Sequence, residues 1–226
     1  MDENLMRIFA LRFVKTFFFA TPLWRYFLPI MKFDMNIPQL DFITKTIRTI
    51  EQSGAVLEVG VGGGATSVII NRYMQEFKIL RPFYAIDTFY GFTKQDILFE
   101  QKVRNKSDNY KYYRSNSMKW YQKTLLANGI GDAKVFQADA GDFDYKVISP
   151  LAFVLLDVDL YKPTKKVLPT IYEILVPGGV IIVDDCSPAE SIYDGAGLAY
   201  REFCDENGLI QELIHDKLGI IRKPLI

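Results

Sequence analysis

The chain has 226 residues, of which 49% are hydrophobic and 24% charged, a composition typical of one α/β domain with a full core. Lysine plus arginine and aspartate plus glutamate number 27 each. The basic excess that a nucleic-acid-binding surface usually needs is therefore missing, and we expect no nucleic-acid partner. The 2 cysteines are too few for a disulfide framework, which favours a reducing, cytoplasmic setting.

An aromatic-rich segment at residues 1–36 precedes the domain expected at residues 37–226. Its longest uncharged stretch, Thr16–Trp24, is 9 residues long, whereas a transmembrane helix needs about 20 apolar residues. Asp2 and Glu3 stand where a signal peptide carries positive charge, which disfavours a secretory signal. Two interpretations stay open: a helical segment that packs on the domain or on a second copy of the chain, and a basic amphipathic segment peripheral to a membrane.

The first half of the domain alternates apolar stretches with turn residues. Ala55–Val59 is short, unbroken and rich in branched residues, which predicts a strand buried on both faces. A glycine loop follows it at Gly60–Gly64. Residues 91–129 are rich in lysine, arginine and tyrosine, and are either a substrate-covering loop or a solvated face. The elements predicted here are helices at 41–52, 66–77 and 117–128, and strands at 55–59, 82–86 and 134–137.

Two further buried strands are predicted in the second half, and both are closed by aspartate. One ends in Asp157-Val158-Asp159 and the other in Asp184-Asp185. A helix at about 163–175, closed by Gly178-Gly179, should connect them. Right-handed winding then makes the strands parallel and brings the carboxylates to one edge of the sheet, where open α/β sheets bind ligands.

The C-terminal part predicts an antiparallel pair of strands. After a helix at 197–207, strands at 210–215 and 218–222 should form a hairpin joined at Asp216-Lys217. Ordinary dinucleotide dehydrogenase domains have a parallel last strand instead. The fold we predict is α/β, a doubly wound, mostly parallel seven-stranded sheet with an antiparallel C-terminal hairpin.

The glycine loop predicts a nucleotide cofactor. Its spacing is G-x-G-x-G, with the third glycine one residue too early for NAD and FAD sites. Glu58 stands just before the loop, where a carboxylate repels a pyrophosphate but suits a cationic ligand. Asp87, at the end of the second strand, is placed to accept two ribose hydroxyls, and Asp139, after the third, to accept an adenine amino group.

Taken together, these motifs resemble the class I S-adenosylmethionine-dependent methyltransferases, which have a Rossmann-like fold. More narrowly, they resemble the macrocin O-methyltransferase (TylF/MycF-like) family, which methylates sugar hydroxyls of macrolides and related natural products. The resemblance extends from roughly Val56 to Lys223. The segments that carry it are Glu58–Gly64, Ile86–Phe92, Leu156–Tyr161, Pro177–Asp185 and Tyr193–Phe203.

The resemblance implies S-adenosyl-L-methionine and Mg²⁺ as cofactors, with the metal held by Asp157, Asp184 and Asp185. Carboxylate oxygens are the ligands that such a hard cation prefers. The metal would hold vicinal hydroxyls of a sugar or glycoside acceptor and lower the pKa of one of them. Asp157 is also our candidate general base, by position. The predicted cofactor-binding residues are Glu58, Gly60, Gly62, Gly64, Thr66, Asp87, Thr88, Phe89, Asp139 and Asp157.

Some features depart from this family or leave other functions open. The segment at 1–36 has no counterpart in it, and Val158 stands where glycine is usual. We expect Asp159 to be structural, because on a continuing strand it would point away from Asp157, and we expect His215 to be a strand residue. The alternatives are a catechol-type O-methyltransferase, an NAD-dependent oxidoreductase, and a non-catalytic module of this fold with membrane or protein partners.

Overall fold

The structure is a computed structural model that describes residues 35–111, 113–114 and 116–225, with residues 10, 13, 14, 16, 17 and 20–22 near the N-terminus. The chain divides into two compact units, Met1–Asp34 and Met35–Ile226. In the first unit the N–H of Ala20 donates to the carbonyl of Thr16 at 3.1 Å. Most of the helical segment expected at 1–36 lies outside the described residues. Within those residues, we find no helix with the length and apolarity that a membrane crossing requires.

The second unit is built on a seven-stranded sheet with the order β3-β2-β1-β4-β5-β7-β6. Strands β1 to β5 pair in parallel, whereas β7 is antiparallel to both β5 and β6. The sheet confirms the predicted fold, including its antiparallel C-terminal hairpin. The strands are β1 Ala55–Val59, β2 Phe83–Asp87, β3 Lys134–Gln137, β4 Leu151–Leu156, β5 Leu175–Val183, β6 Glu212–Ile214 and β7 Leu218–Arg222.

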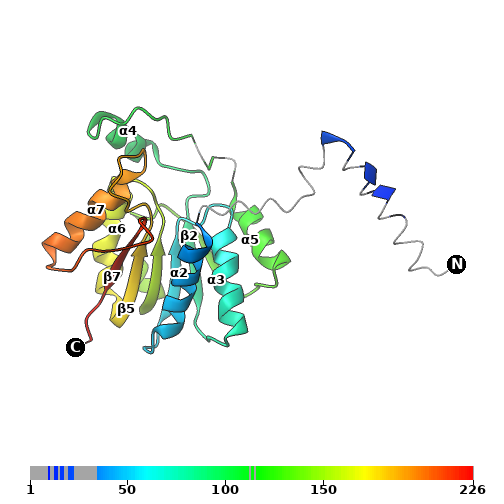
Figure 1. Cartoon of the computed structure of the whole chain (residues 1–226), viewed down its shortest axis with the longest axis horizontal. Coiled ribbons are helices and arrows are strands. Elements are labelled where there is room, and N and C mark those ends of the chain that lie inside the picture. Colours follow the sequence, from blue (N-terminus) through cyan, green and yellow to red (C-terminus); the bar gives the residue numbers. More distant parts are fainter. Residues whose placement is uncertain are drawn as a thin grey trace. The chain divides into compact units, whose positions relative to one another are not determined.

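Helices cover both faces of the sheet. Figure 1 shows α2 and α3 on one side and α6 and α7 on the other, with α4 near one end of the sheet. The helices are α2 Ile37–Thr49, α3 Ala65–Glu76, α4 Lys94–Lys102, α5 Met118–Ala127, α6 Tyr161–Glu173 and α7 Asp194–Glu206, with a 3₁₀ helix η2 at Tyr145–Ile148.

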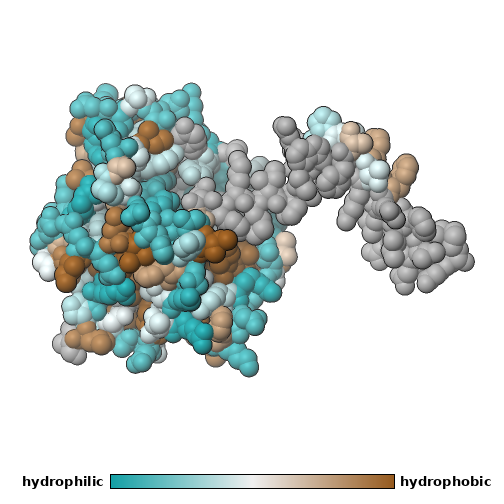
Figure 2. All heavy atoms as spheres, viewed as in Figure 1, coloured by the Kyte–Doolittle hydropathy of each residue, from teal (hydrophilic) through white to brown (hydrophobic). Residues whose placement is uncertain are grey.

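The core lies where the sequence is apolar without interruption. Every residue of β1 and β4 is buried, which is the pattern of strands covered by helices on both faces. The amphipathic helices α6 and α7 bury their apolar side chains against this sheet. Figure 2 shows mainly hydrophilic residues on the visible surface, with hydrophobic ones scattered among them.

The interpretation of Gly178-Gly179 as a helix end is wrong. Helix α6 ends at Glu173 and β5 begins at Leu175, so both glycines lie within the strand. A Cβ at Gly179 would come within 2.9 Å of the Ala152 carbonyl oxygen. The glycines therefore let β5 pass close to β4, where the strand register shifts.

The hairpin turn lies one residue earlier than predicted. His215 and Asp216 have φ values of 52° and 55°, and the N–H of Lys217 donates to the Ile214 carbonyl at 3.2 Å. Positive φ at both central residues is typical of a type I′ turn. Because Ile214 pairs with Leu218, three residues lie between the strands, and Lys217 is the last of them.

Candidate functional site

The glycine loop follows β1 and is confined from two sides. Gly60, Gly62 and Gly64 have φ values of 80°, 48° and 89°, which favour glycine. A Cβ at Gly60 would lie 1.8 Å from the Asp157 carbonyl oxygen, and one at Gly64 would lie 2.9 Å from the ring of Tyr121. The loop therefore passes directly against the end of β4.

Asp87 holds the glycine loop from the end of β2. Its Oδ2 accepts hydrogen bonds from the N–H groups of Val61 (2.8 Å) and Gly62 (3.2 Å), and its Oδ1 accepts one from Phe89 (2.6 Å). The Thr88 hydroxyl also lies 3.5 Å from Oδ1, so the four acceptor sites of this carboxylate already face four donors, and the ribose contact stays a prediction. The Thr88 hydroxyl donates to the Gly91 carbonyl (2.7 Å) and shapes the turn that follows β2.

Glu58 is almost completely buried, with 2% of its surface exposed. Its Oε2 accepts a hydrogen bond from Ser67 (2.5 Å), and the Ser67 Oγ accepts one from the Tyr121 hydroxyl (2.8 Å). Burial raises the pKa of Glu58 to about 8, with Ser67 lowering and Asp87 raising it. This chain from β1 through α3 to α5 was not predicted, because Tyr121 lies far from the loop in sequence.

Asp139 lies in the loop after β3, where its Oδ1 accepts a hydrogen bond from the N–H of Gly141 at 2.8 Å. It borders a cavity of about 310 Å³ that also contacts α4 and α6, through Asp96 and Lys162 among others. Thr66 is the second residue of α3. Asp139, the residue predicted to accept the adenine amino group, thus lies at the same sheet edge as the glycine loop and borders this cavity.

A group of carboxylates, which we call the acid cluster, lies where β4 and β5 end. Its members are Asp157 and Asp159 after β4 and Asp184 and Asp185 after β5. Burial raises the pKa of Asp157 well above its ordinary value; Asp184, Asp159 and Asp185 add to the shift, and Lys217 opposes it. Burial and Asp185 likewise raise the pKa of Asp184. The residues predicted to bind metal therefore lie at neighbouring strand ends and interact through their charges.

The geometric reason given for Asp159 is wrong, because residues two apart on a strand point to the same face. Strand β4 in fact ends at Leu156, and Asp159 has a φ of 60°. Burial raises the pKa of Asp159 well above its ordinary value, and a hydrogen bond with Asp185 adds to the shift. Asp159 is consequently a member of the acid cluster.

Lys217 provides a positive charge at the acid cluster. Its Nζ lies 2.7 Å from Oδ2 of Asp184 and 3.3 Å from Oδ1 of Asp185. Burial would lower the pKa of Lys217, but these carboxylates outweigh it and raise the pKa. The sequence did not indicate this contact, because it depends on the register of the hairpin turn.

The acid cluster has the donor chemistry of a site for a hard divalent cation. Its carboxylates outnumber the one lysine in contact with them, and Oδ1 of Asp184 is buried without a hydrogen-bond partner in the described part of the chain. Buried charges of one sign require a compensating cation or a proton. Among the described residues, no three His, Cys, Asp or Glu side chains are arranged to hold a metal ion.

The sequence profile of the TylF macrocin-O-methyltransferase family matches residues 30–221. The chain belongs to this family. It is an S-adenosylmethionine-dependent O-methyltransferase, as the sequence predicted. The NAD-dependent oxidoreductase is accordingly excluded, whereas the roles of individual site residues remain predictions.

Relatives of this methyltransferase include mycinamicin III 3''-O-methyltransferase from Micromonospora griseorubida. The two sequences are 27% identical over 176 residues, which cover 74% of this chain and 67% of the relative. The solved structure of the O-methyltransferase NovP has a TM-score of 0.68 at 18% identity, covering 84% of this chain and 81% of NovP. Calicheamicin methyltransferase CalS11 has a TM-score of 0.63 at 18% identity, covering 81% of this chain and 76% of CalS11. At these identities the two structures show the fold alone.

Proposed function

We propose that this enzyme transfers a methyl group from S-adenosylmethionine to a hydroxyl of a sugar or glycosylated natural product, with Mg²⁺ at the acid cluster. The supporting observation is that Gly60 of the cofactor loop passes against Asp157 of the acid cluster. A cofactor on the loop and an acceptor at the acid cluster would therefore meet. The likeness to mycinamicin III 3''-O-methyltransferase supports a glycoside acceptor.

The residues at the glycine loop would hold the cofactor. The N–H groups at the start of α3 would offer donors to the ligand, and Asp87, which holds the loop through Val61 and Gly62, would accept from the ribose. Glu58 has a carboxyl group that becomes a better partner for a cationic ligand when it ionises. Thr66, Thr88, Phe89 and Asp139 complete the predicted contacts around the loop.

The acid cluster would hold and activate the acceptor. Asp157, Asp184 and Asp185 would bind Mg²⁺, which when bound polarises a hydroxyl and lowers its pKa. Asp157, the proposed general base, would take the hydroxyl proton. S-adenosylmethionine would supply the methyl group: the hydroxyl oxygen would bond to the methyl carbon, and the electron pair of the broken carbon–sulfur bond would stay on the sulfur of S-adenosylhomocysteine. Fixing both reactants at one sheet edge supplies much of the rate.

Methyl transfer from radiolabelled S-adenosylmethionine tests this proposal. The enzyme would be incubated with glycosides that carry vicinal hydroxyls, with their aglycones and with catechols, each in Mg²⁺ and in EDTA. We expect label on glycosides only, lost in EDTA and restored by Mg²⁺. Labelling of catechols in place of glycosides would show that the acceptor is a catechol. Transfer that persists in EDTA would contradict the dependence on Mg²⁺.

A further inference from the structure

Helix α4 lies in the stretch that the sequence left open between a substrate-covering loop and a solvated face. It packs on α6, and the ring of Phe99 stacks on the ring of Tyr161 with centroids 5.5 Å apart. Tyr110, further along this stretch, is completely buried, and its hydroxyl donates to the Ile192 carbonyl at 2.9 Å. The stretch is therefore attached to the domain on the side of α6 and α7.

Glu100 of α4 caps helix α6 from a distance. Its Oε1 accepts a hydrogen bond from the N–H of Tyr161 (2.8 Å), the first residue of α6. The helix has no side-chain cap of its own, because its N-cap residue is Leu160. A carboxylate at a helix N-terminus satisfies a free donor and interacts favourably with the helix dipole. Glu100 has no exposed surface, so water cannot easily replace it.

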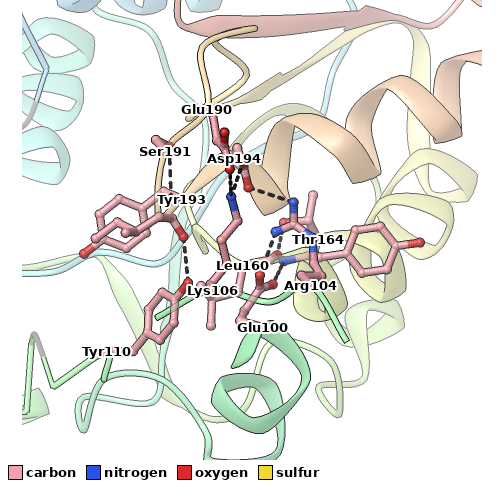
Figure 3. A network of polar contacts seen from close by, with 12 residues as sticks. Glu100, Arg104, Lys106, Tyr110, Leu160, Thr164, Glu190, Ser191, Tyr193 and Asp194 are labelled. Atoms are coloured by element: carbon pink, nitrogen blue, oxygen red, sulfur yellow. Dashed lines mark hydrogen bonds and ion pairs between the residues drawn. The ribbon is translucent and has the colours of Figure 1, made fainter. Parts of the chain in front are cut away.

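Arg104 extends the same contact to helix α7. Its Nη1 donates to Oε2 of Glu100 (2.6 Å) and its Nη2 to Oδ1 of Asp194 (2.7 Å), the first residue of α7. Lys106 donates to the other oxygen of Asp194 (2.6 Å). Helix α7 has no side-chain cap either. Figure 3 shows Glu100, Arg104, Lys106 and Asp194 facing one another between these helices.

Gly195 lets these elements meet. A Cβ at this position would lie 2.5 Å from the backbone nitrogen of Tyr161, 2.7 Å from Nη1 of Arg104 and 3.0 Å from Oε1 of Glu100. Any side chain there would push α4, α6 and α7 apart. Asp194 therefore supplies the carboxylate for the ion pairs with Arg104 and Lys106, and Gly195 leaves the space in which the start of α7 approaches the start of α6.

Both capped helices follow loops of the acid cluster. Helix α6 begins at Tyr161, two residues after Asp159, and the backbone N–H of Ala196 in α7 donates to the Asp159 carbonyl at 3.1 Å. Displacing either helix N-terminus would therefore move Asp159 and its neighbours. A contact made by α4 is in this way transmitted to the catalytic edge of the sheet.

We propose that Glu100 and Arg104 are positioning residues, which join α4 to the N-termini of α6 and α7 and thereby hold the loops that carry the acid cluster. This proposal rests on the proposed function, because it assigns the acceptor to the acid cluster. The glycine loop makes no contact with this network in the described structure. Loss of the network should consequently lower turnover of the acceptor more than it weakens binding of the cofactor.

The test compares Arg104→Met with Arg81→Met. Arg81 is a matched control, because it donates to the carbonyls of Gln52, Gly54 and Ile50 in the loop that enters β1, at the opposite edge of the sheet. We expect Arg104→Met to lower kcat/KM for the labelled glycoside by about tenfold or more, since misplaced reacting groups cost rate steeply. The dissociation constant of S-adenosylhomocysteine should change much less than kcat/KM, because Arg104 bonds to Glu100 and Asp194 and to no described residue of the glycine loop. Arg81→Met should leave both unchanged at a temperature where it remains folded.

Amide hydrogen exchange gives a readout that does not need an acceptor. Peptides that cover the starts of α6 and α7 should exchange faster in Arg104→Met than in Arg81→Met. If the wild-type enzyme methylates no glycoside, the proposed function fails, and this exchange result alone decides the positioning role. Equal exchange in the two variants would overturn the proposal.

A conservative variant separates the hydrogen bond from the charge. Glu100→Gln keeps a side-chain oxygen for the N–H of Tyr161, whereas Glu100→Ala does not. We expect Glu100→Gln to retain more acceptor kcat/KM and more protection at the start of α6 than Glu100→Ala. Equal losses in both variants would contradict capping by Glu100.

Discussion

The site has a cofactor half, which is the glycine loop with Glu58 and Asp87, and an acceptor half, which is the acid cluster with the residues that hold it. The two halves differ in how far apart in the sequence their bonded residues lie. In the cofactor half, Glu58 bonds to a residue 9 positions away and Asp87 to one 26 positions away. In the acceptor half, Asp184 bonds to a residue 33 positions away, and Arg104 to one 90 positions away. The cofactor half is therefore built mainly on the segment from β1 to β2, with Tyr121 reaching Ser67 from 54 positions away, whereas the acceptor half joins elements that are farther apart in the sequence.

The largest effect should come from the acceptor half. Asp157→Asn removes the proposed proton acceptor, and general-base catalysis contributes about 10²- to 10⁴-fold to rate. We expect methyl transfer to fall by a factor in that range, measured with radiolabelled S-adenosylmethionine and a glycoside. Full activity of Asp157→Asn would refute its role, and full activity of Asp184→Ala in chelator-washed enzyme would refute the metal site.

Lys217→Met tests the charge balance of the acid cluster. Breaking a buried ion pair by removing one partner typically costs about 3–5 kcal/mol, so chemical denaturation in EDTA should show a large loss of stability. Mg²⁺ should recover much of it, because a bound cation replaces the missing charge. A Lys217→Met variant as stable as wild type in EDTA would mean that the lysine does not balance these carboxylates.

Gly60 and Gly62 provide a comparison within the cofactor half. Gly60→Ala places a Cβ 1.8 Å from the Asp157 carbonyl oxygen, whereas at Gly62 a Cβ meets nothing within 4 Å. Gly62→Ala should cost only the strain of a positive φ, about 1 kcal/mol. Gly60→Ala should cost considerably more and also weaken binding of S-adenosylhomocysteine. Equal thermal stability of the two variants would contradict the close approach of loop and β4.

The buried Glu58 should make stability depend on pH. Its pKa is raised from 4.5 to about 8 on folding, so protonated Glu58 stabilises the fold at low pH, and this contribution is lost as pH rises towards 8. Between pH 4.5 and about 8, the free energy of unfolding should fall by at most about 1.4 kcal/mol per pH unit because of this group. Glu58→Gln should flatten the curve from denaturation at pH 5.5 to 8.5, while the exposed Glu51→Gln should not. An unchanged slope in Glu58→Gln would contradict the raised pKa.

The sequence predicted what local patterns determine. The apolar runs of β1 and β4, the glycine loop and the aspartates that close the strands identified the sheet and brought Asp157, Asp184 and Asp185 to one edge. The family confirmed by its profile was also predicted from these motifs. Such features are visible because each depends on neighbouring residues.

The partners that the sequence did not indicate are all long-range. Tyr121 reaches Glu58 through Ser67 from α5, and Lys217 reaches the acid cluster only because of the type I′ turn. Glu100 lies on a helix that was not predicted at all, since α4 is short and has no marked apolar face, and Arg104 lies just beyond its end at Lys102. The geometric argument for Asp159 was wrong because residues two apart on a strand share a face, and because β4 ends at Leu156; whether its role is structural stays a prediction.

The most direct test of whether cofactor binding is independent of the acid cluster is isothermal titration calorimetry. S-adenosylhomocysteine would be titrated into the wild-type enzyme, Asp184→Ala and Asp87→Ala. Asp87 holds the glycine loop through the N–H groups of Val61 and Gly62, whereas Asp184 belongs to the acid cluster. We predict that Asp184→Ala binds as tightly as wild type and that Asp87→Ala binds weakly. Equal losses in the two variants, or no binding to wild type, would contradict the account.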